Sequence, residues 1–160
     1  MTEASKKADA VVQVLAEVGL TFHRMRTVGR PRGAVTEWGG GLFAMLRTLK
    51  LGGPMTVPQI ARTRPVARQR IQRLADDAAK EGLVAFIDNP AHKRSRLVEL
   101  TPAGQVWYEE RLQLISTMAV DWSKEVDAAD LKVTLETLRA LGAGLLETIN
   151  EDDLPPLDEG

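Results

Sequence analysis

The chain has 160 residues, of which 44% are hydrophobic and 27% are charged, and its sequence contains no cysteine. This length fits one ordinary domain, or one globular module with extra helices for self-association. A sequence without cysteine excludes disulfides, thiolate metal sites and cysteine nucleophiles. The polar start and the lack of a long apolar run predict a soluble cytoplasmic protein without a signal peptide or membrane contact.

The net charge of −1 hides a strong asymmetry along the chain. Residues 62–96 contain nine Lys and Arg against four Asp and Glu, whereas residues 97–160 contain four against fourteen. A polyanion responds to local charge density more than to the net charge of the whole chain. The middle of the chain is therefore a candidate surface for a polyanion, although a basic stretch can also be an ordinary solvated helix face.

Two helices are expected in the first 50 residues. Residues 8–29 carry apolar side chains at spacings of three and four, which predicts a helix that packs along another helix. These side chains are Val11, Leu15, Val18, Phe22 and Met25. The second helix is expected between residues 36 and 50, but it contains the run Gly39, Gly40 and Gly41. Each glycine costs roughly 1 kcal/mol in a helix interior, so either the helix starts after the glycines or something packs very close to them.

The next segment predicts two short helices separated by a turn. Thr56 and Gln59 stand three residues apart before an apolar run, which is the capping-box pattern of a helix start. Pro65 ends this helix, because a residue before proline disfavours helical geometry. The following helix is expected over residues 66–81, with Gly82 as its left-handed cap.

From residue 83 the apolar period changes to that of strands. The stretches "LVAFIDN" and "SRLVELT" are separated by a polar turn, which predicts a β-hairpin. Thr101 and Pro102 then start a helix that runs to about Trp122, and Asp127 starts the last helix. The apolar side of that last helix carries Leu131, Leu135, Leu138, Leu145 and Ile149.

This order of elements predicts a winged helix-turn-helix, within a mainly α fold that has a small β-hairpin wing and N- and C-terminal dimerisation helices. We expect the dimerisation helix at residues 1–35, the DNA-binding module at 36–101, C-terminal dimerisation helices at 102–150, and a disordered acidic tail at 151–160. In the helix of residues 66–81 one face is apolar and packs inward. Its residues are Ala67, Ile71, Leu74, Ala75 and Ala78.

The opposite face of that helix carries the side chains that commonly read DNA. Arginine pairs with guanine in the major groove and glutamine with adenine. The recognition helix is therefore expected to use Arg68, Gln69, Arg70, Gln72 and Arg73, and the wing to use His92, Lys93, Arg94 and Arg96. Asp76 and Asp77 follow, which indicates that only the N-terminal half of the helix enters the groove.

The stretch from Met55 to Gly104, "MTVPQIARTRPVARQRIQRLADDAAKEGLV" followed after three residues by "DNPAHKRSRLVELTPAG", resembles the multiple antibiotic resistance regulator (MarR) family of bacterial transcription factors. Gly82-Leu83-Val84 and Leu100-Thr101 with Gly104 match the pattern of the family. The sequence departs from that pattern at Arg64-Pro65, Ala67, Ala78 and His92, where the family often has Leu-Gly, serine, leucine and aspartate.

The resemblance implies a homodimer that binds duplex DNA at a pseudo-palindromic operator, and members of the family often bind a small, frequently aromatic effector. We expect a repressor rather than an activator. The apolar stripes at both chain ends also favour a two-fold dimer, with Val11, Leu15, Val18, Phe22, Leu135, Leu138 and Leu145 in its interface. The candidate effector pocket consists of His23, Trp38, Met45, Trp107 and Tyr108, which could equally be core residues. Whether an effector exists, and whether the protein represses or activates, stays open at the level of sequence.

Other functional classes fit the sequence less well. We expect neither catalysis nor a metal or other cofactor, because the two histidines, His23 and His92, stand in no arrangement that suggests a site. The alternative is a winged-helix module for protein–protein contact, or an architectural DNA-binding protein without an effector. An interaction module would be expected to carry apolar anchors where Gln69, Gln72 and Arg73 stand.

Overall fold

The computed structural model describes residues 2–29, 41–63 and 66–149. The chain divides into two compact units, residues 1–40 and residues 41–160. Gly39 and Gly40, Trp38, the Arg64-Pro65 turn and the acidic tail at 151–160 lie outside the described residues.

The first unit contains helix α1, Glu3–Gly29. It begins earlier than residue 8 because Thr2 Oγ1 accepts a hydrogen bond from Ser5 N (3.2 Å), which satisfies an amide of the first turn. Its end at Gly29 is the one expected from the sequence. The apolar stripe stands largely in solvent within this chain, since Val18 is 42% and Phe22 50% exposed.

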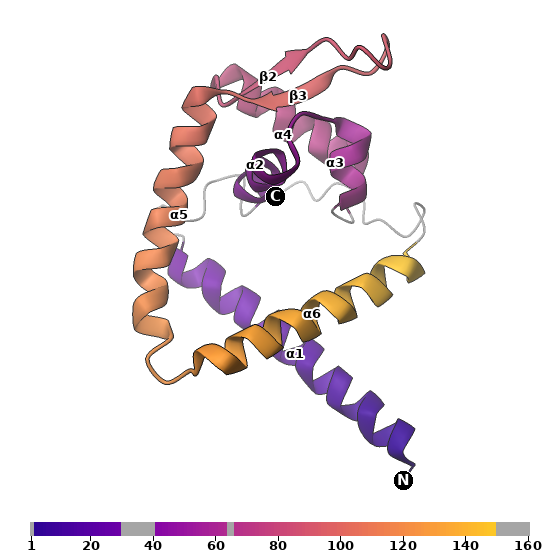
Figure 1. The fold of residues 1–160 in the computed structure, drawn as a ribbon, viewed down its shortest axis with the longest axis vertical. Coiled ribbons are helices and arrows are strands. Elements are labelled where there is room, and N and C mark those ends of the chain that lie inside the picture. Colours follow the sequence, from indigo (N-terminus) through magenta and orange to yellow (C-terminus); the bar gives the residue numbers. More distant parts are fainter. Residues whose placement is uncertain (1, 30–40, 64–65, 150–160) are drawn as a thin grey trace. The chain divides into compact units, whose positions relative to one another are not determined.

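The second unit is a winged helix-turn-helix with two further helices (Figure 1). This architecture confirms the fold class expected from the sequence. The short strand β1 was not predicted, because two residues are too few to show an alternating pattern. The elements in chain order are α2 (Gly41–Gly52), β1 (Met55–Thr56), α3 (Val57–Thr63), α4 (Arg68–Lys80), β2 (Val84–Ile87), β3 (Leu97–Leu100), α5 (Pro102–Trp122) and α6 (Ala128–Thr148).

The three strands form an antiparallel sheet in the order β1-β3-β2. In β3, Val98 pairs with Met55 on one side and with Phe86 on the other, and its side chain is fully buried. The hairpin is thereby held to the start of the helix-turn-helix through β1. This pairing fixes the base of the wing against the module.

Helices α2, α3 and α4 and strand β3 enclose the hydrophobic core. The largest fully buried side chains are Leu42, Met45, Leu46, Ile60, Ile71 and Val98. Helix α2 begins at Gly41, the last of the three glycines. A Cβ added to Gly41 would lie 3.2 Å from Leu74 Cδ1, so α2 also packs tightly against α4 at this point. Of the two explanations offered for the glycines, close packing therefore applies at Gly41.

The end of α4 and the start of α5 are joined through one turn. Gly82 has a φ of +72°, and Leu83 N donates to Ala78 O (2.8 Å), which closes α4 with a Schellman motif. Thr101 Oγ1 accepts from Gly104 N (3.0 Å) and donates to Gly82 O (2.6 Å). The threonine cap predicted for α5 is confirmed, and it also ties α5 to the end of α4.

Helices α5 and α6 expose many apolar side chains. In α5, Val120 is 67% exposed, and among the described residues of α6 none is fully buried. Asp127 is the N-cap residue of α6, as expected, but its side chain makes no capping hydrogen bond. No described helix is long and apolar enough to cross a membrane.

Candidate nucleic-acid interface

The helix-turn-helix begins with the capping box seen in the sequence. Gln59 Oε1 accepts from Thr56 N (2.8 Å), and Thr56 Oγ1 accepts from Gln59 N (3.3 Å). The two side chains satisfy two amides at the start of α3, which would otherwise lack helical partners. Because Thr56 also belongs to β1, the direction of α3 is fixed relative to the sheet.

Helix α4 has the two faces that its sequence predicts. Ile71, Ala75 and Ala78 are buried, and Leu74 is half-buried. Ala67 is the N-cap residue, so the helix begins at Arg68. The five polar residues predicted for DNA contact therefore occupy its first two turns, and all are exposed: Arg68, Gln69, Arg70, Gln72 and Arg73.

The loop between β2 and β3 forms the wing, and Asn89 holds its turn. The side chain of Asn89 donates through Nδ2 to Ser95 O (2.9 Å) and accepts through Oδ1 from Ala91 N (3.0 Å). His92, Lys93 and Arg94 are exposed on this turn. Sequence reasoning missed the role of Asn89, although an asparagine before a proline is a known turn signal.

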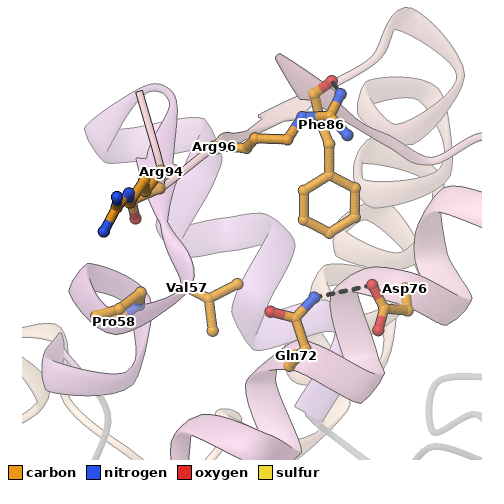
Figure 2. Close-up of a pocket in the computed structure, with 8 residues that line it drawn as sticks. Val57, Pro58, Gln72, Asp76, Phe86, Arg94 and Arg96 are labelled. Carbon is orange, nitrogen blue, oxygen red and sulfur yellow. Dashed lines mark hydrogen bonds between the residues drawn. The ribbon is translucent and has the colours of Figure 1, made fainter. Parts of the chain in front are cut away.

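Two arginines of the wing have different surroundings. Arg96 Nη2 donates a hydrogen bond to Phe86 O, and its guanidinium lies 5.5 Å from the centroid of the Phe86 ring. Arg96 therefore braces β2 against β3. Arg94 reaches outward near the start of α3 (Figure 2).

A groove of about 340 Å³ lies between the wing, α4 and the start of α3 (Figure 2). Gln72 from the recognition face and Arg94 from the wing both line it, so residues far apart in the sequence meet here. In α4, Gln72 Nε2 donates to Asp76 Oδ1 (2.9 Å). The full lining consists of Val57, Pro58, Gln72, Asp76, Phe86, Arg94, Ser95 and Arg96.

The residues predicted for an effector pocket have several environments. Met45 and Tyr108 are buried, and the Tyr108 ring stacks on Phe43 at 4.9 Å between centroids. Trp107 is half-buried, and the guanidinium of Arg111 lies 4.9 Å from its ring centroid. His23 is exposed on α1.

The side chain of Arg111 on α5 has a buried nitrogen. Its Nε is buried, and in the described structure it has no hydrogen-bond partner. One of its terminal nitrogens lies 3.6 Å from Glu110 Oε2. Sequence reasoning did not single out Arg111.

The residues predicted for the dimer interface stand largely free in the single chain. In α6, Leu135 and Leu145 are each 49% exposed, and Leu138 is half-buried. In α1, Val11 is half-buried, whereas Leu15, Val18 and Phe22 are exposed. As for metals, the described residues contain no group of three or more His, Asp or Glu that could hold an ion.

Comparison with known proteins supports the same fold. A MarR family model matches residues 43–95. The protein Mb2034c of Mycobacterium bovis is 37% identical over 90 residues, which are 54% of this chain. The matched stretch spans 61% of the length of that relative.

Two solved structures illustrate the similarity of fold. The MarR family transcription regulator SP03579 aligns with a TM-score of 0.69 at 23% identity, covering 92% of this chain and 100% of that one. BpsR of Bordetella bronchiseptica aligns with a TM-score of 0.66 at 18% identity, covering 82% and 92%. The resemblance indicated by the sequence is thus confirmed: residues 43–95 match the MarR family model, and the chain has the winged helix-turn-helix fold of the MarR family structures to which it is similar.

Proposed function

We propose that this protein is a dimeric transcription regulator that binds a pseudo-palindromic DNA operator and represses transcription. The observation that carries the proposal is the groove in which the exposed face of α4 meets the wing. The side chains that line the groove include a hydrogen-bonding amide, Gln72, and a cation, Arg94. No enzymatic activity belongs to this proposal.

The proposed contacts divide between base edges and phosphates. Gln69, Gln72 and Arg73 project from the exposed face of the first turns of α4 and can reach base edges in the major groove. Lys93 and Arg94 on the wing supply positive charge to the DNA backbone. The polar character of the α4 face favours DNA over a protein partner, which would call for apolar anchors.

A second copy of the chain is the proposed partner of the apolar helices. Burying a leucine side chain contributes roughly 1.5–3 kcal/mol, and Leu135 and Leu145 are each half exposed in the single chain. A two-fold dimer would cover such side chains in both copies at once. It would also place the acidic C-terminal helices apart from the basic modules.

Replacing Leu135 by glutamate tests this partner. We expect the variant to sediment as a monomer, because a carboxylate would have to be buried in the interface. Ala140→Glu is the matched control, since Ala140 is exposed on the opposite face of the same helix and its variant should stay dimeric. A Leu135→Glu protein that remains dimeric would contradict the proposed interface.

The proposal includes release from DNA by a small aromatic acid. The solved structure of BpsR describes regulation of that protein's DNA binding by 6-hydroxynicotinic acid. Here, the guanidinium of Arg111 lies 4.9 Å from the Trp107 ring centroid on α5, so a cation and an aromatic surface stand side by side there. A panel of aromatic acids should contain one that lowers DNA affinity in the wild type and not in Arg111→Ala. A panel without any such acid would favour a regulator or architectural protein that has no effector.

Selection of bound sequences from random duplex DNA tests the function as a whole. We expect an enriched palindrome whose half-sites lie roughly 10–10.5 base pairs apart, one helical turn, since two winged modules would read successive major grooves. Arg73→Ala should weaken discrimination at one position of each half-site by roughly 1–3 kcal/mol if it pairs with a base. A pool that stays random after selection with the wild-type protein would refute the proposed function.

A further inference from the structure

Gln72 and Asp76 form a pair one turn apart on the exposed face of α4. Gln72 Nε2 donates to Asp76 Oδ1 at 2.9 Å. Figure 2 shows the amide nitrogen of Gln72 directed at Asp76 and the amide oxygen on the other side, toward Val57. Val57 offers no side-chain donor to this oxygen.

The chemistry of the pair sets the orientation of the amide. An ionised carboxylate accepts hydrogen bonds and donates none, whereas a glutamine amide has one donating and one accepting end. The NH₂ end of Gln72 must therefore face Asp76, since the reverse orientation would bring two acceptor oxygens together. A free glutamine on the same helix could present either end to a base.

We propose that Asp76 is a positioning residue that makes Gln72 read DNA through its amide oxygen. This proposal rests on the function proposed above. In the major groove, adenine N6 and cytosine N4 are amine donors, whereas guanine O6 and thymine O4 are acceptors. Oε1 of Gln72 accepts from the amines and is repelled by the carbonyl oxygens. Gln72 therefore selects an amine-bearing base at one position in each half-site.

Binding to DNA strengthens this selection. In free solution the pair is exposed, and an exposed pair one turn apart on a helix contributes little. In the complex, rotation of the amide would turn Oε1 toward the Asp76 carboxylate and leave that carboxylate without a donor. DNA displaces part of the water around the pair, and its phosphates add negative charge, so a carboxylate without a donor is disfavoured more in the complex than in the free protein.

A comparison of two aspartate variants tests the proposal. Starting from the selected operator, each position is changed to all four bases, and affinities are measured for the wild type, Asp76→Ala and Asp77→Ala. Asp77 is the matched control, since it pairs with Lys80 (Asp77 Oδ1 to Lys80 Nζ, 2.7 Å) and not with Gln72. Both variants remove one negative charge from the same helix and should bind all sequences somewhat more tightly.

Only Asp76→Ala should change the base preference. We expect the wild type and Asp77→Ala to favour adenine or cytosine over guanine and thymine by roughly tenfold at the position read by Gln72, and Asp76→Ala to favour them by about twofold or less. Adding Gln72→Glu to Asp76→Ala should restore the preference, because a carboxylate presents only acceptor oxygens. The rescue separates positioning from a general disturbance of α4.

The negative results of this test separate the role of Asp76 from the DNA-binding function. An amine preference that is unchanged in Asp76→Ala, or no amine preference at any position that Gln72→Ala alters, would overturn the role of Asp76 while leaving the DNA-binding function intact. A wild-type protein that selects no sequence would overturn both. If Asp76→Ala does not fold, as judged by its melting transition, Asp76→Asn replaces it, since an asparagine amide can accept either end of Gln72 and should also flatten the preference.

Discussion

Replacing Arg94 by alanine removes an exposed cation that lines the groove beside α4. In the proposed complex this side chain neutralises one phosphate in each half of the dimer. Neutralising a phosphate releases condensed counterions from the DNA, so the binding constant falls with salt in proportion to the number of such contacts. The loss of Arg94 should therefore reduce the salt dependence of binding as well as the affinity.

The size of the effect follows from the number of contacts. Each phosphate contact contributes roughly 0.9 to the slope of log affinity against log salt, so a dimer that lacks two should lose about 1.8 from that slope. Between 50 and 200 mM salt, two contacts account for roughly a twelvefold change in affinity. The difference between variant and wild type should accordingly be largest in the most dilute salt.

Fluorescence anisotropy with a labelled operator over a salt series measures this slope. Arg139→Ala is the matched control, because it removes the same charge from an exposed position on α6, away from the wing. Its slope should equal that of the wild type. A slope that Arg94→Ala leaves unchanged would refute the proposed phosphate contact.

Three further changes test the structural support of the site. Gly104→Ala should lower stability by about 2–3 kcal/mol in a thermal or denaturant unfolding assay, since the added Cβ would lie 1.9 Å from Leu83 O. Thr101→Val should cost about 1–2 kcal/mol in the same assay, because it removes the cap of α5 and the hydrogen bond to Gly82 O. Arg96→Ala should speed amide exchange in the wing without altering the exchange of α6.

Nearby positions supply the controls for these three changes. Ala103 is exposed beside Gly104, so Ala103→Gly should cost no more than about 1 kcal/mol. Thr101→Ser keeps the hydroxyl and should keep most of the stability that Thr101→Val loses. Equal stabilities for Gly104→Ala and Ala103→Gly would contradict the close packing of Gly104 against Leu83. An unchanged rate of amide exchange in the wing of Arg96→Ala would contradict the bracing of β2 against β3 by Arg96.

Much of the fold could be predicted because local signals mark the element boundaries. The capping box of Thr56 and Gln59, the left-handed Gly82 and the Thr101-Pro102 start each act within a few residues, so a linear sequence contains them. The phase of α4 was equally readable, since Ile71 and Ala75 recur at helical spacing. These features predicted which face of α4 is buried and which is exposed.

Other features depend on contacts between distant residues and could not be read locally. The sequence shows Gly104 as part of a motif, but the reason for it is the carbonyl of Leu83, which lies where a side chain would be. Arg94 and Arg96 look equivalent in the sequence, but in the structure Arg94 is exposed, whereas Arg96 donates a hydrogen bond to Phe86 O and so links β3 to β2. The pairing of β1 with β3 likewise depends on tertiary packing.

The pairing of Gln72 with Asp76 has a local signal in the sequence. Gln72 and Asp76 stand four residues apart on a helix, a spacing at which side chains meet. On its own, the negative charge of Asp76 indicates only how far α4 enters the groove. The hydrogen bond between the two residues adds the orientation of the glutamine amide to that reading.

The central claim is that the exposed face of α4 reads base edges, and the ratio of operator to scrambled-duplex affinity tests it most directly. The triple variant Gln69→Ala, Gln72→Ala and Arg73→Lys removes the proposed base contacts while keeping the net charge. In the wild type we expect this ratio to be roughly 10³ or more. In the variant it should fall close to one, with the affinity for scrambled DNA unchanged. A variant that keeps the wild-type ratio would contradict the assignment of α4 as the recognition helix.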